Sequence, residues 1–239
     1  MKAKSILAAL LLMVAGSQIA LAQRGVPHKT NGQTVEHEWV DLGLPSGTLW
    51  ATCNIGAKSP EEYGDYFAWG ETSGYKGGKT NFSWETYKYT LTYNELDGTV
   101  KKYCTKSGAS GVVDNKTELE PKDDAATAKW GSEWQMPSYD QLEELANSSY
   151  TTTSWTTLNG VSGRMIISKS NGKRIFLPAG GIRLGISYIG AGMTGGCWSR
   201  SLYEANSQYG RLLYFDSSKI ITGYYYRVHG YSIRPVRVK

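Results

Sequence analysis

The chain has 239 residues, of which 26 are basic and 21 acidic, and its formal net charge is +5. The charges are interspersed and form no basic stripe, which argues against nucleic-acid binding. This length, with 40% hydrophobic residues, is enough for one large folded domain.

The N-terminus has the three parts of a secretory signal peptide. Lys2 and Lys4 form a basic start, residues 6–14 are apolar, and Ala20-Leu21-Ala22 is a small-x-small cleavage site. The apolar run is short for a bilayer span, and no later stretch is longer. We therefore predict a signal peptide over 1–22 and an exported chain without a transmembrane segment, located in the periplasm, at the cell surface or in the medium.

Residues 23–37 are polar and contain Gly25, Pro27 and Gly32, which predicts a flexible leader. Two strands follow, over 38–44 and 48–53, and the turn residues between them indicate a hairpin. Residues 66–70 are strongly apolar and are expected in the core.

From residue 71 to residue 120 no period of two or 3.6 persists, and Gly, Lys, Ser, Thr, Tyr and Asn dominate. The pattern predicts a long loop insertion with small hairpins at most. Loops of this length are uncommon in compact domains unless they serve a function.

Two short helices are predicted in the middle of the chain. Asp123-Asp124 precede the first, over 125–130, and Gly131 ends it. The second begins at Ser138 with Gln141 three residues later, which is a capping-box pattern, and ends near residue 147.

The chain then returns to strands. Asn159-Gly160 and Asn171-Gly172 are hairpin-turn dipeptides, and the second lies between strands 165–168 and 174–177. Residues 182–194 are glycine-rich and are expected to be irregular. Further strands are predicted over 197–201, 211–215, 219–221 and 231–238. Strands, helices and more strands in this order predict an α+β fold with helices packed on antiparallel sheet.

The segments between the last strands are rich in Tyr, Ser, Asn and Arg, which are typical of adaptable binding surfaces. We predict a ligand-binding site there for a protein or a glycan. The other interpretation is that these tyrosines simply cover a sheet face. The candidate site residues are Trp198, Arg200, Tyr203, Tyr209, Arg211, Tyr224, Tyr225, Tyr226, His229 and Tyr231.

The sequence gives little support for catalysis or for a cofactor. A catalytic nucleophile needs a base nearby and a third group that orients the base. Only Cys197 and His229 lie close enough in the sequence to be such a pair, and no residue is identifiable as the third group. We therefore expect no enzyme, no metal and no cofactor. The only indication of calcium is Glu120-Pro121-Lys122, which resembles the Glu-Pro-Asn segment of calcium-dependent lectins. Lysine replaces the asparagine there and offers no oxygen ligand, so calcium is possible but not supported. Export permits a Cys53–Cys104 disulfide, which the sequence leaves open.

Several long motifs run in one order: 39–57 (WVDLGLPSGTLWATCNIGA), 61–71 (EEYGDYFAWGE), 123–138 (DDAATAKWGSEWQMPS), 175–181 (IFLPAGG), 197–201 (CWSRS) and 230–238 (GYSIRPVRV). Together they resemble the Fibrobacter succinogenes major paralogous domain family, secreted proteins of the Bacteroidetes type. The chain departs from the family pattern at Cys197, often aromatic there, and at Arg200, often serine.

The resemblance implies a single C-type-lectin-like domain over 38–239, with the loop insertion 71–120. It implies that strand 39–42 pairs with strand 233–238. It also makes Arg234 a fixed hydrogen-bonded residue and assigns four tryptophans to the core: Trp50, Trp69, Trp130 and Trp134.

For function, the resemblance leaves an exported, non-catalytic ligand-binding module as our first expectation. The alternative is a structural or adhesin-type subunit of a cell-surface assembly. In some lectin-like proteins a retroelement diversifies the residues near the C-terminus by mutating adenines in the template of the gene. Asparagine codons then become codons for Tyr, Ser, Asp, His, Arg or Cys, and residues 197–231 are rich in these amino acids. Ordinary divergence among paralogues explains the same composition, and we favour it.

Overall fold

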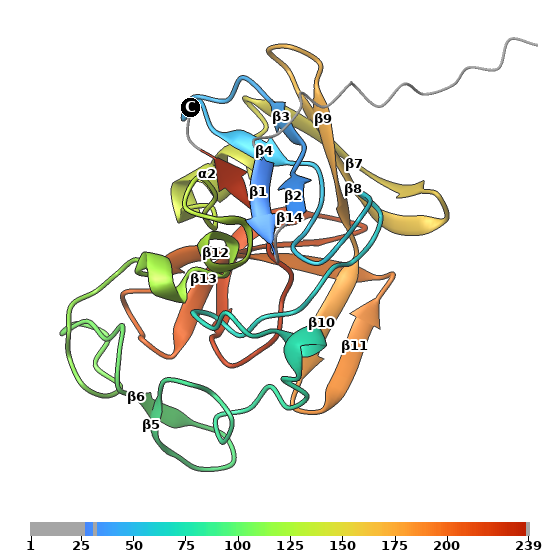
Figure 1. Ribbon diagram of the computed structural model, residues 1–239. Helices are drawn as coiled ribbons and strands as arrows, with labels where there is room; N and C mark the ends of the chain where they lie inside the picture. The colour runs from blue at the N-terminus through green and yellow to red at the C-terminus, as the bar shows by residue number, and fades with distance from the viewer. Residues whose placement is uncertain (1–26, 31–32, 238–239) are drawn as a thin grey trace, which may run out of the picture.

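The computed structural model describes residues 27–30 and 33–237 (Figure 1). The predicted signal peptide lies outside the described residues. Residues 27–36 form a two-stranded hairpin of β1 (Pro27–Thr30) and β2 (Gln33–Glu36). These residues fall within the predicted leader, and their backbone groups pair across the turn.

The first and last strands of the domain share one small sheet. It contains β3 (Trp39–Asp41), β4 (Leu49–Ala51) and β15 (Val236–Arg237) in the order β15-β4-β3. The predicted hairpin of β3 and β4 is confirmed, but direct pairing of 39–42 with 233–238 is wrong. All three residues of β4 are buried, so both edges of its backbone need partners, and it lies between the other two strands.

Both predicted helices are confirmed, with their caps. In α1 (Ala125–Trp130) the Asp124 carboxylate accepts the N–H groups of Ala126 and Thr127. In α2 (Tyr139–Ala146) Ser138 and Gln141 form the reciprocal capping box. These bonds satisfy amide groups that the first turn of a helix leaves without partners.

A three-stranded meander follows, consisting of β7 (Thr151–Leu158), β8 (Val161–Ser168) and β9 (Arg174–Pro178). Asn159 and Gly160 have φ of 48° and 82°, as the first predicted hairpin turn requires. The turn at 171–172 is confirmed as well, because β8 and β9 pair around it.

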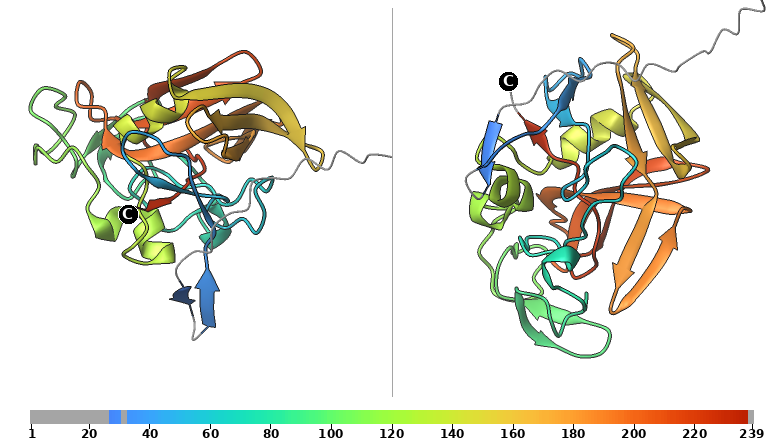
Figure 2. Two further views of the ribbon diagram at one scale, coloured as in Figure 1. Left: turned by 90° about the horizontal axis from the view of Figure 1, so that it is seen from above. Right: turned by 45° about the vertical axis from the view of Figure 1, so that its right-hand side comes forward.

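The expectation of irregular structure over 182–194 is wrong. Strands β10 (Gly180–Leu184) and β11 (Ser187–Ala191) form a hairpin that projects from the body of the molecule (Figures 1 and 2). Gly181 and Gly190 have φ of 64° and 73°, and the regular strand pairing is interrupted at these two residues. The glycines therefore produce an irregularity within a hairpin and not an irregular loop.

The central sheet contains β12 (Thr194–Leu202), β13 (Tyr209–Asp216) and β14 (Ile220–Tyr226), and it separates two hydrophobic cores. Cys197 and its register partner Leu213 belong to the core that includes Leu142 and Leu145 of α2. The next pair, Trp198 and Leu212, belongs to the other core. The four tryptophans predicted for the core are all buried.

The segment 71–120 is not a structureless loop. It contains the 3₁₀ helix η1 (Tyr75–Gly77) and the paired strands β5 (Thr90–Tyr93) and β6 (Gly98–Val100). The 3₁₀ helix η2 (Pro121–Asp123) follows directly after the segment. It also contributes large buried aromatic residues to the core: Phe82, Trp84, Tyr87, Tyr89 and Tyr103. The aromatic residues follow no period, so sequence patterning misses their burial. The whole is an α+β architecture of antiparallel sheets with two short helices.

Candidate binding surface

The tyrosines near the C-terminus lie mainly on strands, and not on the loops that the sequence suggested. Strand β14 contains Tyr224, Tyr225 and Tyr226, and the pairing register divides them between the two sheet faces. Tyr224 is opposite Arg211 and Tyr226 is opposite Tyr209, whereas Tyr225 is opposite Gly210. Because side chains alternate along a strand, Tyr225 points away from the other two.

Six residues on one side of the sheet form what we call the tyrosine face: Tyr139, Tyr203, Tyr209, Arg211, Tyr224 and Tyr226. The rings of Tyr203 and Tyr224 are parallel, with centroids 3.9 Å apart. Those of Tyr209 and Tyr226 stack at 4.5 Å. Tyr224 remains 46% exposed, so the stack reaches solvent. Burial together with Tyr226 raises the pKa of Tyr209 to about 12, so its hydroxyl stays neutral at physiological pH.

Arg211 provides the positive charge of this face. Its guanidinium lies 4.1 Å from the ring centroid of Tyr139 and 4.8 Å from that of Tyr203. In the described part of the chain, no carboxylate lies within ion-pair distance of this group. A guanidinium held by cation–π contact keeps its edge donors available for another acceptor. Tyr139, which sequence reasoning missed, reaches the face because α2 begins beside β14, where its hydroxyl lies 3.2 Å from Thr222 Oγ1.

Two of the predicted site residues are buried and cannot touch a ligand directly. Trp198 lies in the aromatic core and donates its indole N–H to the Phe67 carbonyl at 2.8 Å. Tyr231 packs edge-on against Trp198, with ring centroids 5.1 Å apart. Both side chains lie on the inner side of the sheet. Strand alternation directs Trp198 there, and the β-bridge between Tyr231 and Phe67 holds Tyr231 there.

Two others lie outside the tyrosine face. Arg200 forms an ion pair with Glu118 at 2.7 Å and donates to the Met136 carbonyl, so its charge is already compensated. Tyr225 lies on the opposite side of the sheet, where it contacts Tyr214 and Tyr231.

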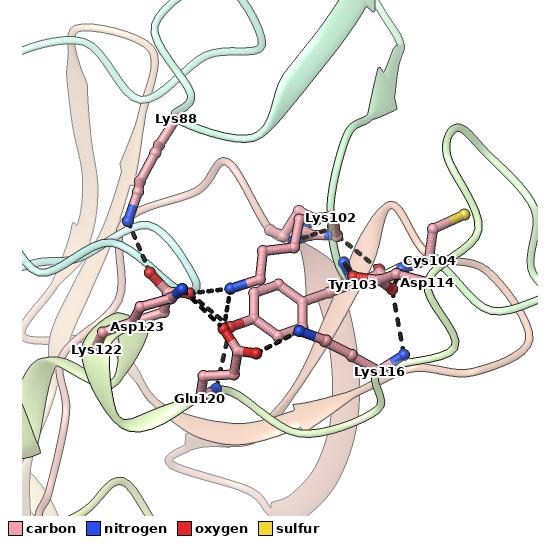
Figure 3. A network of polar contacts seen from close by, with 10 residues as sticks. Lys88, Lys102, Tyr103, Cys104, Asp114, Lys116, Glu120, Lys122 and Asp123 are labelled. Carbon is pink, nitrogen blue, oxygen red and sulfur yellow. Dashed lines mark hydrogen bonds and ion pairs between the residues drawn. The ribbon is translucent and has the colours of Figure 1, made fainter.

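A network of charged groups fixes segment 71–120 to the start of the helical region (Figure 3). Lys102 Nζ contacts the carboxylates of both Glu120 and Asp123 at 2.5 Å, and Tyr103 donates its hydroxyl to Asp123. The lysine partners lower the pKa of the Glu120 carboxyl to about 2. Glu120, the residue weighed as a calcium ligand, thus has ammonium groups as its neighbours, including Lys116 and Lys122.

His229 is a half-buried histidine beside the tyrosine face, edge-on to Tyr226 at 5.7 Å. Burial lowers its pKa to about 4. The unfolded chain therefore binds a proton near pH 6.5 while the folded chain stays neutral, and stability falls as the pH drops from 6.5 to 4. We expect wild type to lose up to about 3 kcal/mol more than His229→Gln between pH 7 and pH 4. Urea titrations at several pH values measure this; parallel pH profiles would contradict it.

The cysteines are all free thiols, so the Cys53–Cys104 disulfide is not formed. Burial raises the pKa of the Cys197 thiol to about 11, which disfavours the nucleophilic thiolate at neutral pH.

In the described residues, no group of three or more His, Cys, Asp and Glu side chains could hold a metal ion. Within that same part of the chain, neither α1 nor α2 nor any other helix has the length and hydropathy of a membrane span.

The chain was compared with protein-family models, with curated proteins and with solved structures, and none of the three comparisons finds a match.

Proposed function

We propose that this protein is an exported, non-catalytic binding module that recognises a protein partner through the tyrosine face. The observation that carries the proposal is the Arg211 guanidinium, which lies between the rings of Tyr139 and Tyr203 and has no ion pair within the described residues. Tyr and Arg are the residues most often found as energetic anchors of protein interfaces. Their pre-ordered stacking lowers the entropy that binding would otherwise cost.

The stacking also favours a protein over a glycan at this face. A sugar ring packs against the open face of an aromatic ring, but Tyr203 and Tyr224 cover one face of each other, and Tyr209 and Tyr226 do the same. Each stack leaves at most the outer faces of its rings, and beside them it presents ring edges, hydroxyl groups and the Arg211 donors. These groups suit the peptide carbonyls and carboxylates of a protein surface.

The double variant Tyr224→Ala/Arg211→Ala tests the proposal. Each anchor is worth about 2 kcal/mol or more, so we expect each substitution to weaken binding at least about 30-fold and the pair to abolish it. The measurement is a pull-down from intact producing cells, followed by titration of the captured protein. A glycan array run in parallel would show whether the ligand is a sugar instead.

Tyr225→Ala is the matched control, because it alters the same strand on the opposite face. It should retain binding. If the double variant folds and binds its partner as wild type does, the site lies elsewhere. If a glycan is retained by wild type and lost by the double variant, the surface is right and the partner class is wrong.

The family resemblance and the C-type-lectin-like fold belong to the same proposal. Antiparallel sheets, two short helices and a small sheet that contains both β3 and β15 support it. Cleavage after Ala22 would place the module outside the cytoplasm, and N-terminal sequencing of the exported protein tests this. A cell-surface assembly subunit is the alternative role, in which a neighbouring subunit would cover the tyrosine face permanently.

A further inference from the structure

A second arginine, outside the tyrosine face, is also surrounded by tyrosine rings. Arg183 lies in β10, where its backbone N–H and C=O both bond to Gly230, at 2.9 and 2.8 Å. Its guanidinium carbon is 3.6 Å from the ring centroid of Tyr75, 4.4 Å from Tyr188 and 5.4 Å from Tyr66. The rings come from η1, from β11 and from the apolar segment before η1, so the fold assembles this cage from three separate elements.

The cage leaves the charge of Arg183 uncompensated. Within the described ranges, no carboxylate forms an ion pair with it, and its Nε is buried without a hydrogen-bond partner. Burying this donor without a partner is unfavourable, and an acceptor bound to the guanidinium would relieve it. The nearby carboxylate of Asp65 accepts the backbone N–H groups of Tyr66 and Lys76 instead.

Two of the three tyrosine hydroxyls of the cage, those of Tyr66 and Tyr188, are already paired with each other. Tyr66 donates to the Gly180 carbonyl at 2.5 Å, and the Tyr66 and Tyr188 oxygens lie 2.8 Å apart. Because Tyr66 uses its proton on the carbonyl, Tyr188 must donate to Tyr66. The donors left for a ligand are therefore those of Arg183 and the Tyr75 hydroxyl, and the planar fork of Arg183 matches a two-oxygen anion.

We propose that Arg183 with Tyr66, Tyr75 and Tyr188 forms a second binding site, which takes the carboxylate of an acidic sugar. One uncompensated cation matches one negative charge, whereas phosphate groups are usually bound by clusters of cations. Tyr75 and Tyr188 are 37% and 40% exposed, so each ring keeps open area beside the guanidinium. An amphipathic sugar ring can pack there while its carboxylate reaches Arg183.

The test follows the Arg183 Nε–H signal by nitrogen NMR in the intact mature protein, with Arg183→Lys used to assign it. Glucuronate, galacturonate and N-acetylneuraminate are titrated in turn, with glucose and galactose as neutral controls and N-acetylglutamate as the peptide-type carboxylate. We expect at least one acidic sugar to shift this signal in a saturable way. The neutral sugars should leave it unchanged, and N-acetylglutamate should bind at least about tenfold more weakly than the sugar.

Tyr75→Ala removes one wall of the cage without touching Arg183 and should weaken sugar binding several-fold. Arg211→Met, in the tyrosine face, should leave sugar binding unchanged. The sugar site can therefore fail or succeed independently of the protein-binding site proposed above. The proposal is overturned if none of the three acidic sugars shifts the Arg183 signal, or if the neutral sugars shift it equally. Equal binding of N-acetylglutamate would make the ligand an acidic peptide and refute the sugar.

Discussion

Replacing Arg227 by methionine should lower the free energy of unfolding by about 3–5 kcal/mol, the largest effect that we expect from a single substitution in this chain. Arg227 is 0% exposed and donates through Nε to the Tyr87 hydroxyl at 2.6 Å. Its other donors bond the carbonyls of Lys102, Tyr103 and Ser207 at 2.9–3.2 Å. The guanidinium also lies 4.7 Å from the Trp69 ring centroid.

Methionine fills most of the volume but donates no hydrogen bond. Removing a buried, uncompensated cation is favourable by itself, because charge burial is costly. The two buried carbonyls of Tyr103 and Ser207 and the partly buried carbonyl of Lys102, left without this donor, outweigh that gain, since each unsatisfied buried group costs about 1–3 kcal/mol. Segment 71–120 would lose one of its attachments to the C-terminal strands.

Urea unfolding followed by circular dichroism measures the loss. Arg211→Met is the matched control: the same change on the tyrosine face, where no hydrogen bond is removed, should stay within about 0.5 kcal/mol of wild type. A loss below about 1 kcal/mol for Arg227→Met would mean that the carbonyls find other partners.

Deleting residues 234–239 should abolish cooperative folding. The deletion removes β15 from beside β4 and breaks the two backbone bonds that join Gln135 and Val236 at 2.9 Å. It also removes the fully buried Arg234, which donates to Asn54 Oδ1 and to the carbonyls of Ala51, Thr52 and Phe176. Strand β4 would then have one open edge inside the core, where water cannot replace the lost bonds.

Thermal unfolding monitored by near-ultraviolet circular dichroism tests this. Arg237→Ala is the control: its only described ion pair, with Glu133 at 3.6 Å, is partly exposed, so it should cost less than about 1 kcal/mol. A truncated chain that melts cooperatively at the wild-type temperature would show that β15 is dispensable.

Local features of the chain were determined by the sequence alone. Helix α2 is an example, because a capping box and apolar spacing act within one or two turns. The hairpin turn at 159–160 is another, since Asn-Gly favours the left-handed conformations that both residues adopt. At 171–172 only Gly172 is left-handed, with φ of 71°. The core positions of the four tryptophans also follow from composition and the resemblance.

Relations between distant segments were decided only by the tertiary structure. The sequence places Tyr224, Tyr225 and Tyr226 together, but the register of β14 on β13 sends Tyr225 to the other side. Neither Tyr139 nor the Arg183 cage could be located from the sequence, because their neighbours are set by long-range packing. The order β15-β4-β3 was likewise missed, since a strand pattern shows that an edge needs a partner but not which strand supplies it.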